Sequence, residues 1–348
     1  MLKRFIFGLL IAATSAQAAL GKDFSKTASA APPEPVHWPL LWTHGEPLDY
    51  DDSTEHILET KGVGTRTHSR GITRISTSRG SDGVVQRWTS LASLGRETNT
   101  SEAEQAFMQE MEREFRDTTL EVRLTEEGTF AGIANIQVIQ SRYQEIFNAW
   151  LEREGKKNKA PVAMEDEKIR QRLLAAYTSV PVLEAQLSNL PSAYNFPSGG
   201  GLGLDFEYEY EDQGANPLGG EPFPMTGRMT LSPDELHPGW LMLEWTIGID
   251  REKGGPILAE AVRKLLGEEF TAKGGKEKAE ALQELSSDLD IGSSTRFRID
   301  PKTGVVQWMQ FVQRRRVGDR NDLRTSTLSL RAEPYVKPEA APIPAPQG

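Results

Sequence analysis

The stretch GLGLDFEYEYE, residues 201–211, decides the fold because two kinds of side chain alternate along it. Its apolar or aromatic residues are Leu202, Leu204, Phe206, Tyr208 and Tyr210, and its acidic residues are Asp205, Glu207, Glu209 and Glu211. Successive side chains of a β-strand point to opposite faces of a sheet. The pattern therefore predicts a strand with its rings turned to a core and its carboxylates turned to water.

The acidic row has three readings: a metal site, an acid/base pair or a solvated sheet face. Alternate side chains of a strand lie about 6.5–7 Å apart, and an inverting glycosidase separates its carboxyl groups by about 6.5–9.5 Å. Glu207 and Glu209 fit that spacing, but an acid catalyst needs the raised pKa of an enclosed pocket. Calcium takes six to eight oxygen ligands, usually from a curved loop. An open row favours the third reading, a solvated or ion-paired sheet face.

Basic residues are concentrated in other predicted strands. Residues 61–100 carry seven basic and two acidic side chains, residues 291–332 carry nine and three, and residues 201–222 carry six acidic and no basic ones. Opposite charges on neighbouring strands stabilise a sheet by roughly 0.2–1 kcal/mol per pair. We expect some of the arginines to lie across from the acidic row. If they formed an isolated positive patch, Arg296, Arg298, Arg314 and Arg316 would instead bind an anion such as a lipid phosphate or lipopolysaccharide.

Periodicity predicts strands and helices along the whole chain. Strands are expected at 65–79, 84–94, 225–231, 239–250 and 323–331, with hairpins at 119–136 and around 300–304. Helices are expected from Ser101, over 139–151 and 169–177, from the Gly254-Gly255-Pro256 start, and over 276–289. Because parallel βαβ alternation is missing, the order favours an antiparallel α+β fold. About ten strands in one sheet would curl, giving a half-barrel with helices packed on its concave face.

The first 18 residues have the features of a cleavable signal peptide. Lys3 and Arg4 precede an apolar run at 5–13, and Ala16-Gln17-Ala18 is a small-residue cleavage site. The run is far shorter than the roughly 20 residues that span a bilayer. The prediction is cleavage after Ala18 and a periplasmic or secreted protein.

Composition sets further limits. The chain has no cysteine, so it cannot form a disulfide. Its formal net charge of −10 disfavours binding to nucleic acid. Residues 19–36 read as a disordered tether and 333–348 as a disordered tail rich in proline and alanine. Between them, 37–332 is predicted to form one domain, which could divide into two similar halves at about 60–190 and 200–332. We expect no cofactor and no transmembrane segment.

Other motifs give weaker indications of chemistry. LDYDDSTEH, residues 48–56, gathers acids and a histidine on an expected loop, where a cation could bind. SGGGLG precedes a strand, so we interpret it as a turn rather than a phosphate loop. Trp38 and Trp42 suggest either an arm docked on the core or a ligand lip. Without a cysteine nucleophile or a Gly-x-Ser-x-Gly elbow, no residues predict nucleophilic catalysis.

The layout resembles the periplasmic lipoprotein-carrier fold, a curved, incomplete antiparallel barrel with helices plugging its mouth. The resemblance rests on the signal peptide, the hairpins LTEEGTFAGI and FRIDPKTGVVQWMQF, and the helix-then-strand order, over about residues 60–332. It implies an apolar cavity for acyl chains or for a partner's lipid, and it assigns no individual binding residue.

The leading hypothesis is a non-enzymatic envelope protein that binds a hydrophobic or amphiphilic ligand, or a partner protein. Its expected cavity wall is Phe206, Tyr208, Tyr210 and Trp308. One alternative is a scaffold module without a cavity, which links partners through its proline-rich ends. Another is a hydrolase built on Glu207 and Glu209 or on the acidic cluster at 48–56.

Overall fold

The computed structural model describes residues 33–40, 45–80, 83–115, 118–157, 178–214, 221–266, 289–317 and 319–336. The predicted signal peptide, the helical stripe at 169–177, Trp42 and nearly all of the predicted helix at 276–289 lie outside these residues. The last residue of that helix, Leu289, begins a strand.

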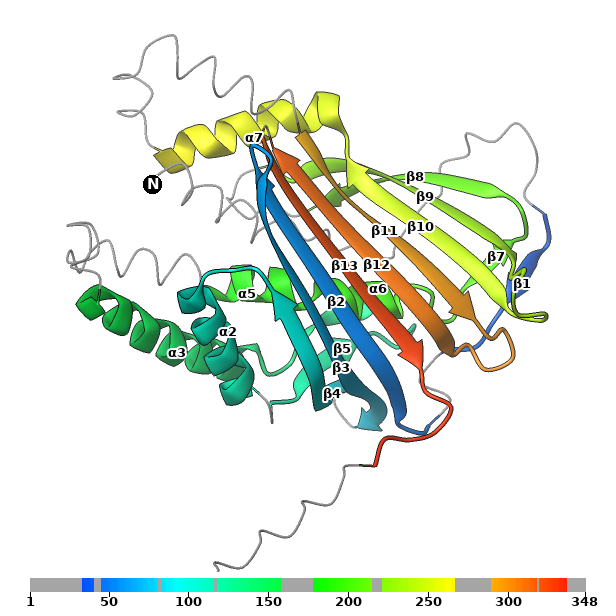
Figure 1. Cartoon of the computed structure of the whole chain (residues 1–348). Coiled ribbons are helices and arrows are strands. Elements are labelled where there is room, and N and C mark those ends of the chain that lie inside the picture. Colours follow the sequence, from blue (N-terminus) through cyan, green and yellow to red (C-terminus); the bar gives the residue numbers. More distant parts are fainter. Residues whose placement is uncertain are drawn as a thin grey trace, which may run out of the picture.

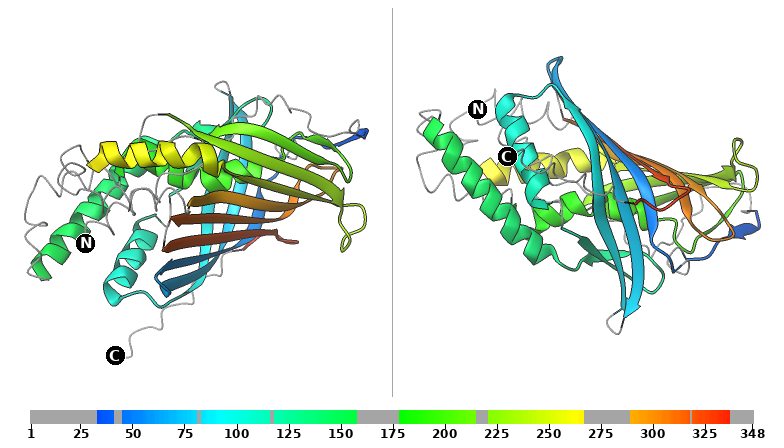
Figure 2. Two further views of the ribbon diagram at one scale, coloured as in Figure 1. Left: turned by 90° about the horizontal axis from the view of Figure 1, so that it is seen from above. Right: turned by 60° about the horizontal axis from the view of Figure 1, so that its bottom comes forward.

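Eleven antiparallel strands form one sheet, and a separate pair of short strands lies near one end of it (Figure 1). Their order across the sheet is β6-β5-β4-β3-β2-β13-β12-β11-β10-β9-β8. The strands are β2 (Leu48–Thr60), β3 (Val63–Gly80), β4 (Gly83–Thr98), β5 (Leu120–Leu124), β6 (Phe130–Ile133), β8 (Glu207–Gly214), β9 (Phe223–Pro233), β10 (Leu241–Ile249), β11 (Leu289–Ile299), β12 (Val306–Val317) and β13 (Arg320–Leu330). Because β6 and β8 do not pair, the described sheet is twisted but open (Figure 2). The predicted antiparallel α+β class is confirmed.

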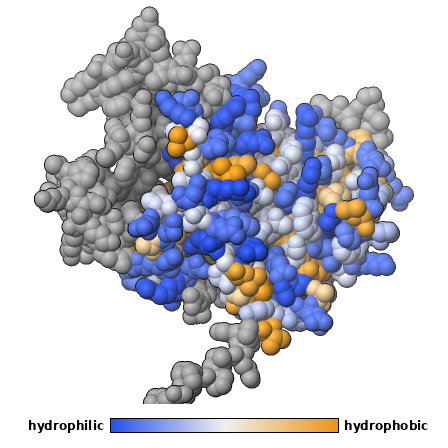
Figure 3. Space-filling model, in the orientation of Figure 1, coloured by the Kyte–Doolittle hydropathy of each residue, from blue (hydrophilic) through white to orange (hydrophobic). Residues whose placement is uncertain are grey.

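The two faces of the sheet differ in chemistry. In β10, Leu241, Leu243, Trp245, Ile247 and Ile249 are buried, and the residues between them are more accessible. We call the side of the sheet that these residues share with the buried core the core face, and the opposite side the outer face. Figure 3 looks onto the outer face, where hydrophilic residues predominate and hydrophobic ones are scattered. Alternation along each strand thus separates a packed face from a wet one.

The predicted hairpins and strands form, and the two proposed halves share the sheet. β2 to β6 build one side and β8 to β13 the other. They meet where β2 pairs with β13, with Tyr50 opposite Leu330. The Tyr50 hydroxyl bonds to the Val306 carbonyl and to the Tyr194 hydroxyl, which ties the junction to the core.

The expectation of a loop at residues 48–56 is wrong, because this segment is part of β2. Alternation turns Asp52, Thr54 and His56 to the core face, and Asp51 and Glu55 to the outer face. Both faces of the strand are therefore polar over residues 51–56. The hydrophobic alternation that identifies a half-buried strand is missing from the sequence here.

The opening stretch forms two strands rather than one. Asp205 has a left-handed backbone (φ 55°) and separates β7 (Gly201–Gly203) from β8. β7 pairs with β1 (Pro35–His37), so the end of the predicted tether is an ordered arm. A Cβ on Gly203 would lie 2.4 Å from Pro33 Cγ, so glycine permits this close approach.

The helices are α2 (Glu102–Phe115), α3 (Ile136–Lys157), α5 (Val180–Leu187), α6 (Asn189–Asn195) and α7 (Arg251–Leu266). α5 and α6 lie behind the sheet in Figure 1. Ile133, Ile136, Ile139 and Leu183 form a small second core between β6, α3 and α5. Among the described helices, none has the length and apolar character needed to cross a membrane.

α7 begins earlier than its sequence suggests. The Asp250 carboxylate accepts hydrogen bonds from the N–H groups of Glu252 (3.1 Å) and Lys253 (3.2 Å), which caps the helix at its true start. Pro256 therefore lies inside the helix rather than at its first position.

Candidate functional site

The acidic row is the outer face of an edge strand. Tyr208 and Tyr210 turn to the core, while Glu207 and Glu211 are exposed. Glu209 pairs with Arg228 on the neighbouring strand, with 2.9 Å between Oε1 and Nε. The structural interpretation of this row is confirmed for 207–211. A carboxylate on an open sheet face lacks the enclosure that acid catalysis requires.

The arginines of β11 do not lie across from this row, so that expectation is wrong. Two strands, β9 and β10, separate β8 from β11. Arg296 instead pairs with Glu244 (2.9 Å), directly opposite on β10. Arg298 pairs with the buried Asp234 (2.9 Å). Burial acts to raise the pKa of Asp234, but the Leu236 N–H and the charge of Arg298 lower it overall.

The outer-face arginines of β12 also have an acidic neighbour. Arg314 Nη1 lies 3.9 Å from Asp290 Oδ2, and Arg316 is opposite Asp290 in the register. The four predicted anion-binding arginines thus lie on the outer face among carboxylates and not in an isolated positive patch.

The predicted cavity wall is divided between the two faces. Phe206 and Tyr208 pack edge to face, and the Gly203 N–H donates a hydrogen bond to the Tyr208 hydroxyl. Tyr210 is buried in the core. Trp308 lies on the outer face, opposite Arg298, whose guanidinium is 5.1 Å from the centre of the indole ring. Trp308 therefore cannot share a cavity wall with Tyr210.

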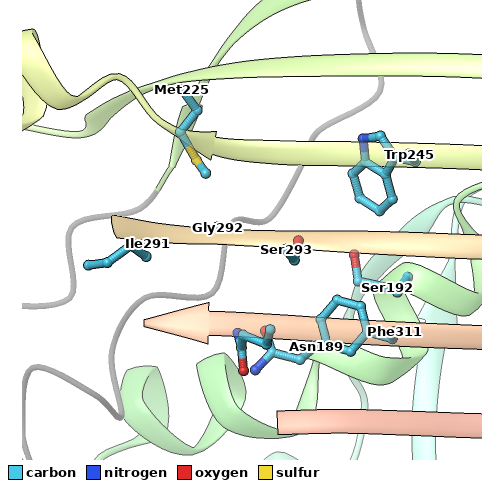
Figure 4. A pocket seen from close by; sticks show the side chains of 10 residues that line it. Asn189, Ser192, Met225, Trp245, Ile291, Gly292, Ser293 and Phe311 are labelled. Atoms are coloured by element: carbon cyan, nitrogen blue, oxygen red, sulfur yellow. The ribbon is translucent and has the colours of Figure 1, made fainter. Parts of the chain in front are cut away.

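A hollow on the core face lies beneath α6. Its sheet side includes Met225, Trp245, Ile291 and Phe311, and its helix side includes Asn189 and Ser192 (Figure 4). The cavity volume is about 30 Å³, which is about the share of space that one water molecule occupies. Ser293 and Gln313 also line the sheet side and Ala193 lines the helix side, so each wall mixes apolar and polar side chains.

Trp245 is the fixed centre of the sheet wall. Its indole Nε1–H donates a hydrogen bond to the Tyr210 hydroxyl (2.6 Å). Phe196, which follows α6, stacks on the indole with ring centres 3.7 Å apart and an angle of 2°. Burial raises the pKa of Tyr210 above its ordinary value. Its hydroxyl therefore keeps its proton at neutral pH.

Buried polar side chains anchor the C-terminal end of α6. Asn195 and Gln86 are both fully buried and exchange two hydrogen bonds, of 2.7 and 3.0 Å. Tyr194 bonds to Tyr50 (2.9 Å) and packs edge to face on Trp88. Asn189 and Ser192, at the other end, border the hollow. Nothing in the sequence indicates that α6 lies over Trp245.

A second and larger hollow, of about 440 Å³, lies at the end of β8. Its lining includes Glu211, Asp212, Asp250 and Lys253. Lys253 Nζ lies 3.3 Å from Asp250 and 3.9 Å from Glu211, so charges within the hollow already pair with one another. It is therefore a weaker candidate for an apolar ligand than the hollow beneath α6.

The acids of β2 have separate partners. Asp49 accepts two hydrogen bonds from Arg74 (2.7 and 2.8 Å) and one from the Tyr335 N–H (2.7 Å), so the start of the predicted tail lies against β2. Asp51 pairs with Arg331. Across the described ranges, no group of three or more potential ligand side chains is placed to hold a metal ion.

Comparison with known proteins gives little. No protein-family model matches the chain, and no curated protein does. A chain from the complex of Pseudomonas aeruginosa MucA and MucB is 9% identical, with 84% of this chain and 92% of that chain covered. The TM-score is 0.12, a likeness too slight to support an argument about fold or function.

Proposed function

We propose that the chain is an exported envelope protein that binds an amphiphile on the core face of its open sheet, without catalysing a reaction. The observation that carries the proposal is the hollow between α6 and the sheet, with its apolar wall of Trp245, Ile291 and Phe311. In the proposal the core face is the concave side of a half-barrel, and α6 is part of its cover.

The polar residues that α6 places at the hollow support a site that opens. Polar side chains gain little from packing against an apolar surface, because they exchange water for contacts without hydrogen bonds. Asn189 and Ser192 therefore add little to the adhesion of α6 at its N-terminal end. The buried Asn195–Gln86 pair and the Tyr194–Tyr50 bond hold the other end.

The size of the hollow sets the mode of binding. A volume of about 30 Å³ does not admit an alkyl chain. The N-terminal end of α6 must move away from β12 for a chain to enter, while Asn195 stays in place. An apolar chain against the sheet wall would then gain roughly 0.8 kcal/mol for each buried methylene.

The experiment is native mass spectrometry of the purified protein, followed by solvent extraction of any retained molecule. We expect a bound amphiphile that is lost on extraction and that rebinds. Ser192→Leu should weaken rebinding, since leucine at this position closes the gap with an apolar contact to the sheet.

The matched control is Trp308→Ala, which truncates a tryptophan on the outer face. It should leave rebinding unchanged. A protein that retains nothing and binds no alkyl amphiphile would refute the proposal. Capture of partners that depends on residues 333–348 would then favour the scaffold alternative.

A further inference from the structure

Charged and polar side chains interrupt the core face beside the hollow. We call Gln313 and Arg315 of β12, Asp322 and Arg324 of β13, and His56 of β2 the arginine cluster. In the register Arg315 lies opposite Asp322, and Arg324 lies opposite both Gln313 and His56. All five share the face of Phe311, because alternate residues of a strand point the same way.

Positive charge exceeds negative charge within the cluster. Its two guanidinium groups face one carboxylate, that of Asp322, which also bonds to His56 (3.0 Å from Nε2 to Oδ1). Burial acts to raise the pKa of Asp322, but His56, Arg315 and Arg320 lower it overall, so it is charged at neutral pH. The single carboxylate is therefore shared among several donors.

The two arginines also oppose each other. Burial lowers the pKa of Arg315 to about 10; Asp322 counteracts this shift and Arg324 adds to it. Arg324 reaches solvent, but the protein packed around it lowers its pKa in the same direction. An additional anion would relieve both the repulsion and the loss of hydration.

Arg324 is the member available to a ligand. Its side chain is accessible to solvent. Among the described residues, none makes a hydrogen bond or an ion pair with its guanidinium, and its electrostatic partner is Asp322. A guanidinium presents five N–H donors that suit phosphate and carboxylate oxygens.

The outer-face arginines provide the contrast. Arg296 and Arg298 each have a carboxylate at 2.9 Å, and Arg314 has one at 3.9 Å. An incoming anion would have to compete with those acids. Arg324, which has no carboxylate in hydrogen-bond contact among the described residues, is the better anion site.

The arginine cluster and the hollow are continuous. Gln313 belongs to both, and Ile291 of the hollow lies opposite Arg315. Arg324 and Trp245 lie on strands three steps apart, roughly 14 Å at about 4.8 Å per step. A dodecyl chain is long enough to reach across this distance.

We propose that Arg324 binds the anionic head group of the amphiphile whose chain enters the hollow beneath α6. The inference rests on the proposed function and adds the charge of the ligand to it. A phosphate or carboxylate at Arg324 directs the chain over Gln313 toward Phe311 and Trp245.

The test is isothermal titration of the full chain with dodecyl phosphate, with uncharged dodecyl maltoside and with inorganic phosphate, all below micelle concentrations. Arg324→Gln should weaken the binding of dodecyl phosphate about tenfold or more, because a hydrogen bond to a charged group contributes about 1.5–3 kcal/mol. The affinity for dodecyl maltoside should stay unchanged, and this binding also shows that the variant is folded. Arg324→Lys should retain part of the affinity.

The matched control is Arg314→Gln, one residue from Arg315 in β12 but on the outer face. It should bind all three probes like the wild type. Salt should weaken dodecyl phosphate binding in the wild type and much less in Arg324→Gln.

The outcomes separate the two proposals. If neither dodecyl compound binds, the proposed function fails and this inference fails with it. If both bind and Arg324→Gln affects neither, the head-group site is wrong while the amphiphile site stands. Inorganic phosphate that binds as tightly as dodecyl phosphate would also overturn the inference, since the occupant would then be a free anion.

Discussion

The buried amide pair between Gln86 and Asn195 should control the position of α6. Gln86 Nε2 donates to Asn195 Oδ1 (3.0 Å), and Asn195 Nδ2 donates to Gln86 Oε1 (2.7 Å). Gln86 Oε1 also accepts the Trp88 indole N–H (2.7 Å). In Asn195→Leu the Gln86 amide loses its partner in a place that water does not reach. The free energy of unfolding should fall by about 2–4 kcal/mol, since the variant loses the two hydrogen bonds to Gln86 and the one that Asn195 Nδ2 donates to the Pro191 carbonyl (2.9 Å).

A double-mutant cycle with Gln86→Leu measures the pair directly. Leucine at both positions removes the donors and acceptors together, so the double variant should be more stable than the sum of the single changes predicts, by about 1–3 kcal/mol. Urea unfolding followed by circular dichroism gives the four free energies. Gln310→Leu, on the outer face, is the control, and its effect should add to that of Asn195→Leu within about 0.5 kcal/mol. A coupling for Gln86 and Asn195 as small as this control would refute the anchoring role.

Two further predictions concern Asp49 and the arm. Hydrogen bonds from Arg74 lower the pKa of Asp49, so its carboxylate stabilises the fold above the unfolded value of about 3.9 and this contribution is lost as pH falls through the lower folded value. Asp49→Asn should therefore be less stable than the wild type near neutral pH and should lose less stability on acidification. Urea titrations at several pH values measure this, and free energies of unfolding that change with pH in parallel for the two proteins would contradict it. Gly203→Ala should press a methyl group into Pro33 and release β1 from β7. Hydrogen exchange should then rise about tenfold or more at residues 36–38 and not in β10. Unchanged exchange in the arm would disprove the contact.

The sequence was most informative where one face of a strand is apolar and the other polar. β9 and β10 follow this pattern, and both were predicted close to their observed bounds. β2 was missed because its core-face residues, such as Asp52 and His56, are polar. The partners that bury and bond these residues lie on β13, which is distant in the chain, and on β3, which follows β2.

The candidate site was harder to predict because it depends on strand order and on which face a residue occupies. Trp308 precedes Met309 and lies near Phe311, so apolar residues occupy both faces and the pattern does not assign the indole to one. The sequence does not distinguish Arg315 from Arg314 and Arg316, although Arg315 alone of the three shares the core face with Ile291. The pairing register of β12 with β11 determines which face Trp308 and Arg315 occupy, and this register cannot be derived from a single sequence.

Photo-crosslinking tests the central claim most directly. A dodecyl phosphate that carries a diazirine at the end of its chain would be bound, irradiated and located by peptide mass spectrometry. We predict adducts on α6 and on the core-face residues Trp245 and Phe311, with fewer adducts in Ser192→Leu. Adducts confined to outer-face residues such as Trp308, or none above the level of unfolded protein, would contradict a ligand site beneath α6.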